Sequence, residues 1–254
     1  MARSPNWTKK ELTLALELYL ETPFSKISPN DPKAIALANA IGRSSNAVAI
    51  KLANFARLDP DLSARNLSGM KNGSKLDVEV WNEFSSDWDK LVEISNEVRK
   101  SIFSQDKGAL NLEQLDYFQE TDKLSSGTVR TKQGLFRRMV LASYNYRCCI
   151  SDFGNTSLLV ASHIVPWAEE VEHRLNPHNG LCLNSLLDRA FDVGLITILS
   201  TDFTVRMSEQ LLNEELLGEA QFFGKYNKKS ITLPDRFPPK MEFLKFHNDN
   251  VFQN

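Results

Sequence analysis

Apolar residues recur at helical spacing in three short segments near the N-terminus. One face of the first segment, residues 6–21, carries Leu12, Ala15, Leu16 and Tyr19. Such a stripe predicts a helix, which Asn6 or Thr8 can cap. Residues 33–42 predict a second helix ending at Gly42, and a third is predicted after Ser44. Three short helices with a glycine-containing turn before the last are typical of a helix-turn-helix module, which we expect over residues 1–60.

The middle of the chain changes character. Residues 66–75 are rich in Gly, Asn and Ser, as linkers are. Residues 76–103 are acidic and amphipathic, with large apolar residues at helical spacing. We therefore expect residues 61–125 to form a linker and acidic spacer helices between two functional ends.

The C-terminal half combines strands and helices. Residues 131–143 predict an amphipathic helix with its basic side chains outward, namely Lys132, Arg137 and Arg138. A strand at Cys148–Ile150, a turn, and a second strand over residues 158–165 predict a hairpin, with His163 near the end of its second strand. A helix running to Gly194 is predicted next, followed by two further strands and a helix. The predicted fold class is therefore α+β, with residues 126–254 as the C-terminal domain.

Composition and charge narrow the class of protein. The chain is 42% hydrophobic and 24% charged, as globular proteins are, and no apolar run is long enough for a transmembrane helix. Three cysteines and no apolar leader favour a reducing cytoplasm. The net charge is -2, but residues 126–150 hold five Lys/Arg and no Asp/Glu. A local basic surplus of this kind is what a nucleic-acid backbone attracts.

The N-terminal segment resembles a Myb-like DNA-binding domain. The resemblance rests on Trp7, on the acidic Glu11 that follows it, and on "IGRSSNAVAIKLANF" from Ile41 to Phe55. It implies that the third helix lies in the major groove of DNA. The residues it places against DNA are Arg43 and Ser44 near phosphates, with Asn46, Ala49, Lys51 and Asn54 on the helix. A plain three-helix packing domain is the alternative interpretation.

The C-terminal segment resembles the HNH nucleases of the ββα-metal class. The matching motifs are "SHIVPW", "NPHNGL" and "LLDRAFDVGLI", preceded by "FRRMVLASYNYRCCISD". The resemblance covers residues 131–198 and implies a core of two strands and a helix that hydrolyses phosphodiester bonds.

Phosphodiester hydrolysis needs a base to deprotonate water and a cation to stabilise the charge that develops. A histidine titrates near neutral pH, so we take His163 as the general base. His173 and His178 are lower-ranked alternatives, and His247 is expected to be a bystander. Asn179 is expected to pin the loop that carries His163, or else to cap a helix. Arg174 is expected to contact a phosphate.

Two carboxylates are the expected metal ligands. Asp188 and Asp192 are four residues apart and so share one face of a helix. Oxygen ligands suit Mg²⁺ or Mn²⁺ better than zinc, and we expect one such ion, with Ser162 beside it. The sequence departs from the family pattern twice, because Ser162 replaces an aspartate and Asp188 replaces the last histidine. The three cysteines do not form CxxC pairs and are expected to be small core residues.

The sequence thus predicts a metal-dependent DNA endonuclease that acts on double-stranded DNA, and the resemblance to HNH nucleases implies a role in bacterial restriction or phage defence. One core cuts one strand, so a double-strand break requires a homodimer or two visits. A DNA-binding regulator with a degenerate, inactive core is the alternative. A third interpretation is a structure-specific or RNA-directed nuclease whose N-terminal helices contact protein.

Overall fold

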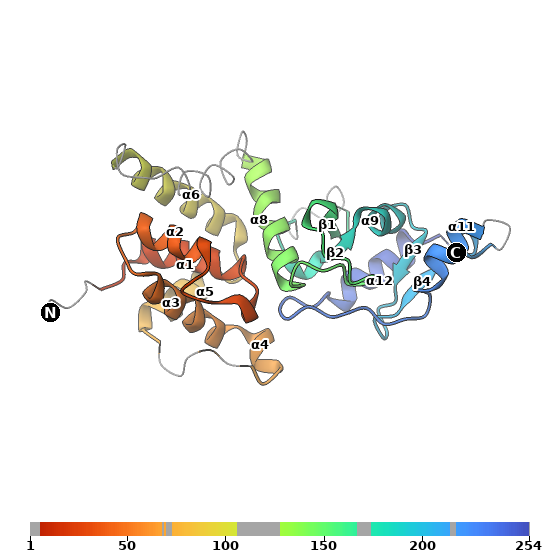
Figure 1. Ribbon diagram of the computed structural model, residues 1–254, viewed down its shortest axis with the longest axis horizontal. Coiled ribbons are helices and arrows are strands. Elements are labelled where there is room, and N and C mark those ends of the chain that lie inside the picture. The colour runs from red at the N-terminus through yellow and green to blue at the C-terminus, as the bar shows by residue number, and fades with distance from the viewer. Residues whose placement is uncertain are drawn as a thin grey trace. The chain divides into compact units, whose positions relative to one another are not determined.

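The computed structural model describes residues 6–67, 69, 73–105, 128–166, 174–213 and 217–253. They fall into two compact units, divided between Arg138 and Met139 (Figure 1). Within the described ranges, no helix is both long and apolar enough to cross a membrane.

The N-terminal unit is helical. Its helices are α1 (Lys9–Leu20), α2 (Pro32–Ala40), α3 (Ser45–Leu58), α4 (Pro60–Ala64), α5 (Lys75–Phe84) and α6 (Trp88–Gln105), and the first part of α8 (Thr128–Ser143) belongs to it too. The start of α1 is a capping box, in which the Thr8 hydroxyl accepts from the Glu11 backbone N–H and the Glu11 carboxylate accepts from that of Thr8. Every residue of α1 from Leu12 to Leu20 is buried, because α2, α3, α5 and α6 surround it.

The turn between α2 and α3 depends on Gly42. Its φ of 65° lies in the left-handed region, and the N–H of Arg43 bonds the Ala38 carbonyl at 2.8 Å. The Ser44 side chain then accepts from the Ala47 N–H and caps α3. The expected glycine-containing turn is therefore present.

The division of the chain differs from the sequence expectation. The helices α5 and α6, expected to be spacers, pack on α1, and α5 also packs on α3. The reason is aromatic packing: Trp81 of α5 stacks on Phe55 at a ring distance of 6.5 Å and meets Tyr19 edge-on at 6.1 Å. The first three helices are thus part of a larger helical unit rather than a separate domain. The expected boundary between residues 125 and 126 lies outside the described residues.

The C-terminal unit holds two small antiparallel sheets and several helices. Its elements after α8 are β1 (Leu159–His163), β2 (Gly180–Asn184), α9 (Ser185–Asp192), β3 (Ile196–Ile198), β4 (Val205–Met207), α10 (Glu209–Leu212), α11 (Leu217–Gly224) and α12 (Met241–Asn250). The strand β1 pairs with β2, and β3 pairs with β4. This mixture of helices and strands agrees with the predicted α+β class.

The hairpin is not the one that the sequence predicts. The segment Cys148–Ile150 is a turn, not a strand, since the Cys148 N–H bonds the Phe153 carbonyl and Asp152 has a φ of 58°. The partner of β1 is Gly180–Asn184, predicted as the start of a helix. That helix begins only after Asn184, whose side chain accepts from the N–H groups of Leu186 and Leu187.

The true hairpin places His163 at the end of its first strand, opposite Gly180. The helix α9 follows β2 directly and packs on both strands (Figure 1). Two strands and a helix therefore form one small unit with His163 at its edge.

Candidate functional site

A cavity of about 340 Å³ opens beside the end of β1. It is lined by Ser162 and His163 from β1, by Asp188 and Asp192 from α9, and by His247 from α12. Chain segments far apart in the sequence thus bring five polar side chains to one hollow.

The His163 ring is held in one orientation. Its Nε2 lies 3.0 Å from the carbonyl oxygen of Arg174. A carbonyl can only accept, so Nε2 carries the proton and Nδ1 of the neutral ring carries the lone pair. Burial lowers the pKa of His163, and the bond to the carbonyl only partly opposes this. The ring is therefore neutral at physiological pH, in the tautomer that can take a proton on Nδ1.

Asn179 fixes the backbone just beyond His163. Its side-chain oxygen accepts from the Val165 N–H at 2.8 Å, and its amide nitrogen donates to the Val165 carbonyl at 3.2 Å. The Ile164 N–H also bonds the Asn179 carbonyl. Asn179 ends a 3₁₀ turn (Pro177–Asn179) and precedes β2, so the helix-capping alternative is wrong. The cap of α9 is Asn184.

The two carboxyl groups of α9 both have raised pKa values. Burial raises the pKa of Asp188, against the lowering influence of the Ser162 hydroxyl and the Arg189 charge. Partial burial, followed by the nearby charge of Asp188, raises the pKa of Asp192, which lies at the exposed mouth of the cavity. A cation between them would relieve both effects.

Ser162 adds an oxygen to this side of the cavity. It is 3% exposed, and its hydroxyl forms no hydrogen bond of regular geometry with the described residues, although it lies near the Asp188 carboxyl. A buried hydroxyl without a partner calls for a ligand or water, because an unmet hydrogen bond is costly.

His247, expected to be a bystander, lines this cavity and is 1% exposed. Its Nε2 donates to the carbonyl of Phe191 at 3.1 Å, and its Nδ1 accepts from the Thr197 hydroxyl at 2.8 Å. The ring stacks on Phe191 at 3.7 Å, and burial lowers its pKa to about 4. The neutral His247 side chain thus connects α12 to the last turn of α9 through a hydrogen bond and ring stacking. In the sequence, only the position of His247 in an amphipathic C-terminal helix could have suggested this role.

The segment that forms most of this cavity also matches a known protein family. Residues 148–199 match the family model of HNH endonucleases. The chain carries an HNH endonuclease domain. The matched segment contains β1, β2, α9 and β3, and with them Ser162, His163, Asn179, Asp188 and Asp192. No curated protein matches the chain.

The groups that could hold a metal in the HNH domain are few. Among the described residues, no three His, Cys, Asp or Glu side chains are grouped as a metal site. The donors at the cavity are instead two carboxylates and the buried Ser162 hydroxyl. These are oxygen donors, which fit Mg²⁺ or Mn²⁺ when the remaining positions are filled by water and substrate phosphate.

Among the alternative bases, His178 does not line the cavity. The Nδ1 of His178 lies 2.8 Å from the Pro238 carbonyl, and its ring packs edge-on against Phe237. His178 thus anchors the segment before α12. The other alternative base, His173, lies outside the described residues. Arg174 is half-buried and supplies the carbonyl that orients His163.

The three cysteines of the domain are buried, as expected. Cys149 N–H bonds the Cys182 carbonyl at 2.8 Å, and burial strongly raises the pKa of the Cys149 thiol. Cys182 lies in β2 rather than in a helix. Protonated, buried thiols pack as small apolar groups.

Two of the residues predicted to contact DNA are internal. Lys51 is 8% exposed and forms an ion pair of 2.8 Å with Asp77, and Asn54 is 4% exposed and donates to the same carboxylate at 3.0 Å. The structure contradicts a groove-facing role for both, because α5 covers that face of α3. Ala49 is buried as well.

The other residues predicted to contact DNA have different surroundings: two are hydrogen-bonded within the unit and one is exposed. Arg43 pairs with Glu11 through two hydrogen bonds of 2.9 and 3.0 Å, and Ser44 serves as the cap of α3. Asn46 is exposed.

Two basic residues of α8 are also paired. Lys132 bonds Asp89, and Arg138 bonds Glu21 at 2.5 Å. Arg137, the third residue of the expected basic face, is exposed. Acidic residues at the end of α1 and in α6 thus partly neutralise the local surplus that the sequence shows.

Proposed function

We propose that the chain is a metal-dependent endonuclease that hydrolyses phosphodiester bonds in DNA. The observation that carries the proposal is the oriented, neutral His163 in one cavity with Asp188 and Asp192, inside the segment that matches the HNH family. A proton acceptor and an oxygen-donor site in one hollow are the two requirements of this reaction.

His163 is the general base. Its Nδ1 takes a proton from water, the water oxygen attacks phosphorus, and the bond from phosphorus to the 3′ oxygen breaks. The Arg174 carbonyl stabilises the imidazolium that results, since it accepts a hydrogen bond from Nε2. Asn179 is a positioning residue, because it touches the backbone two residues beyond His163 and not the cavity.

Asp188, Asp192 and the Ser162 hydroxyl would hold the divalent cation. A bound cation supplies positive charge that stabilises the phosphorane and the leaving oxygen. Binding it requires both carboxylates to be ionised, and the raised pKa values of these two groups make that requirement dependent on pH. The Arg174 side chain is proposed to contact the scissile phosphate.

The proposed setting is restriction or phage defence in the cytoplasm. Its support is the pairing of an HNH domain with a separate helical unit that can recognise the substrate. Since one core cuts one strand, we propose that a homodimer makes a double-strand break.

A DNA-binding regulator with an inactive HNH core is the second candidate. Two observations favour it: Ser162 occupies a ligand position, and the described residues hold no three-ligand metal cluster.

A plasmid assay separates the two candidates. Supercoiled plasmid, modified or unmodified, is incubated with the chain and Mg²⁺, Mn²⁺ or EDTA, and nicked and linear forms are counted. The nuclease proposal predicts cutting with a metal and none with EDTA. Binding to plasmid without cutting in any condition would support the regulator.

A further inference from the structure

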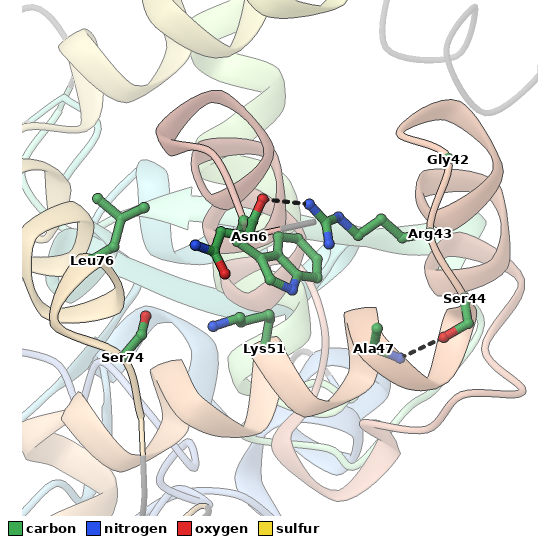
Figure 2. A pocket seen from close by; sticks show the side chains of 9 residues that line it. Asn6, Gly42, Arg43, Ser44, Ala47, Lys51, Ser74 and Leu76 are labelled. Atoms are coloured by element: carbon green, nitrogen blue, oxygen red, sulfur yellow. Dashed lines mark hydrogen bonds between the residues drawn. The ribbon is translucent and has the colours of Figure 1, made fainter. Parts of the chain in front are cut away.

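A second cavity, of about 750 Å³, lies in the N-terminal unit. It is lined by Asn6, Trp7, Arg43, Ser44, Lys51 and Ser74, among others. Figure 2 shows Arg43 and Lys51 at its wall, with Ser44 at one end and Ser74 at the other. All of these side chains come from within the first 76 residues, so the cavity is independent of the HNH domain.

The wall of this cavity combines apolar residues with several hydrogen-bond donors, among them two cations and an indole. The Arg43 guanidinium carbon lies 4.6 Å from the centroid of the Trp7 ring, and the Lys51 ammonium lies 5.6 Å from it. Trp7 is half-buried and contributes an indole whose N–H can only donate. Donors of this kind suit an acidic oxygen ligand.

The two cations are balanced by carboxylates behind them. Arg43 pairs with Glu11, and Lys51 pairs with Asp77. Burial raises the pKa of each carboxyl, but the hydrogen bonds and charge of the paired cation, together with hydrogen bonds from Thr8 or Ser74, leave both pKa values lowered. Both pairs are therefore charged, and side chains alone leave the cavity near neutral.

The helix backbones make the electrostatic potential of the cavity positive. The beginnings of α1, α3 and α5 all border the cavity, through Trp7, Ser44 and Ser74. Glu11 and Asp77 lie in the first turns of α1 and α5 and compensate their helix dipoles, whereas the first turn of α3 has no acidic residue. The uncompensated end of α3 adds positive potential to a wall that already holds donors and an aromatic ring.

We propose that this cavity binds a phosphate group of a DNA strand, with the neighbouring sugar against Trp7. The inference rests on the proposed action on DNA, and it moves the contact from the outer face of α3 into the cavity. The space exceeds that of a phosphate alone, which leaves room for the sugar. Phosphate contacts position a protein on DNA without reading its sequence.

The test uses charge variants of α3 in the full chain. Ala47 lines the cavity at the third position of α3, where Glu completes a capping box with Ser44, so Ala47→Glu adds a negative charge without a cost to the helix. Ala47→Gln is the uncharged control. Asn46→Glu puts the same charge on the exposed neighbour, on the face that the Myb-like interpretation would use.

Binding is measured by fluorescence anisotropy of a labelled duplex oligonucleotide in EDTA, so that no cutting occurs, and urea unfolding confirms that each variant is folded. We expect Ala47→Glu to weaken binding about tenfold relative to Ala47→Gln, with a smaller salt dependence, and Asn46→Glu to have less effect. Trp7→Phe, which keeps the ring and removes the N–H, should weaken binding in the same direction.

Equal binding by Ala47→Glu and Ala47→Gln would overturn the inference, as would a larger effect of Asn46→Glu or no binding by the wild type. Thymidine monophosphate and inorganic phosphate are added as competitors. Ala47→Glu could weaken the binding of either competitor and leave duplex binding unchanged. In that case the cavity binds a free phosphate, and the assignment to DNA is overturned. The variants could change DNA binding as predicted while the wild type never cuts plasmid. That result would refute the proposed nuclease activity but not the phosphate site.

Discussion

His163 combines a fixed ring with a lowered pKa, and both properties come from its neighbours. The Arg174 carbonyl selects the tautomer, and burial favours the neutral form. At the other wall, burial raises the pKa values of Asp188 and Asp192, and the charge of Asp188 raises that of Asp192 further. The pKa of the histidine is thus lowered and the pKa values of the two carboxyl groups are raised, so the difference between them is smaller than in water.

The pH dependence of cutting follows from His163. Its pKa is lowered from 6.5, so the base stays unprotonated as pH falls below that value. We expect the acid limb of the single-turnover rate, at saturating Mg²⁺, to have its midpoint below pH 6.5. A midpoint above 6.5 would show that another group is the base.

Asn179→Ala should loosen the loop after His163. The change leaves the Val165 N–H and carbonyl buried without their partner, which costs about 2 kcal/mol or more of stability. We expect a lower urea midpoint and a reduced cutting rate. Asn179→Asp keeps the acceptor for the N–H, so it should be less damaging to stability; equal loss in both variants would contradict this assignment.

The residues differ in how far the sequence reveals them. His163 and the Asp188–Asp192 pair stand out from local spacing and type. Lys51 and Asn54 were misassigned because Asp77, their partner, lies 26 and 23 residues away. His247 was missed because its contact with Phe191 spans 56 residues. Burial set by distant segments is not visible in a local pattern.

At the scale of elements, the helices of the N-terminal unit were the most predictable. Their caps, Thr8, Asp31 and Ser44, precede apolar stripes and mark their starts locally. The hairpin was predicted with the wrong partner, because the apolar segment Gly180–Asn184 fits a strand or a helix equally well. Only pairing with Leu159–His163 decides between them.

The docking of α12 on α9 should be sensitive to acid. Burial lowers the pKa of His247 to about 4, so the folded state requires its neutral form. This contributes about 3 kcal/mol of stability above pH 6.5, which is lost as pH falls from 6.5 toward 4. We expect the free energy of unfolding, from urea curves, to decline over that range in the wild type.

His247→Phe provides the matched comparison. It keeps the stacking on Phe191 but removes the titrating group and two hydrogen bonds, so stability at pH 7.5 should fall by about 2 kcal/mol. Its remaining decline between pH 6.5 and 4 should be smaller than that of the wild type. An unchanged decline would assign the acid sensitivity to other groups.

At the scale of the whole molecule, charge pairing changes what the sequence suggests. The basic surplus of residues 126–150 is partly cancelled in the folded chain, because Lys132 and Arg138 pair with Asp89 and Glu21. A net charge of -2 is thus compatible with nucleic-acid binding only through local sites. We propose that the two units meet this requirement separately, one through the cavity beside Trp7 and one through the cavity beside His163.

Metal binding should stabilise the folded chain measurably. A ligand that binds only the folded state at 100 times its Kd adds about 2.7 kcal/mol. We expect Mg²⁺ or Mn²⁺ to raise the melting temperature of the C-terminal unit, and EDTA to reverse this. The double variant Asp188→Asn, Asp192→Asn should show no metal response; an undiminished response would place the ion elsewhere.

The most direct test of the account compares wild type and His163→Ala in single-turnover cutting of supercoiled plasmid with Mg²⁺, with DNA binding measured in parallel. Removing a general base should slow cutting by about 100-fold or more while binding is retained. Cutting by the variant at the wild-type rate, or no cutting by the wild type with any divalent cation, would contradict the assignment of this cavity as the nuclease site.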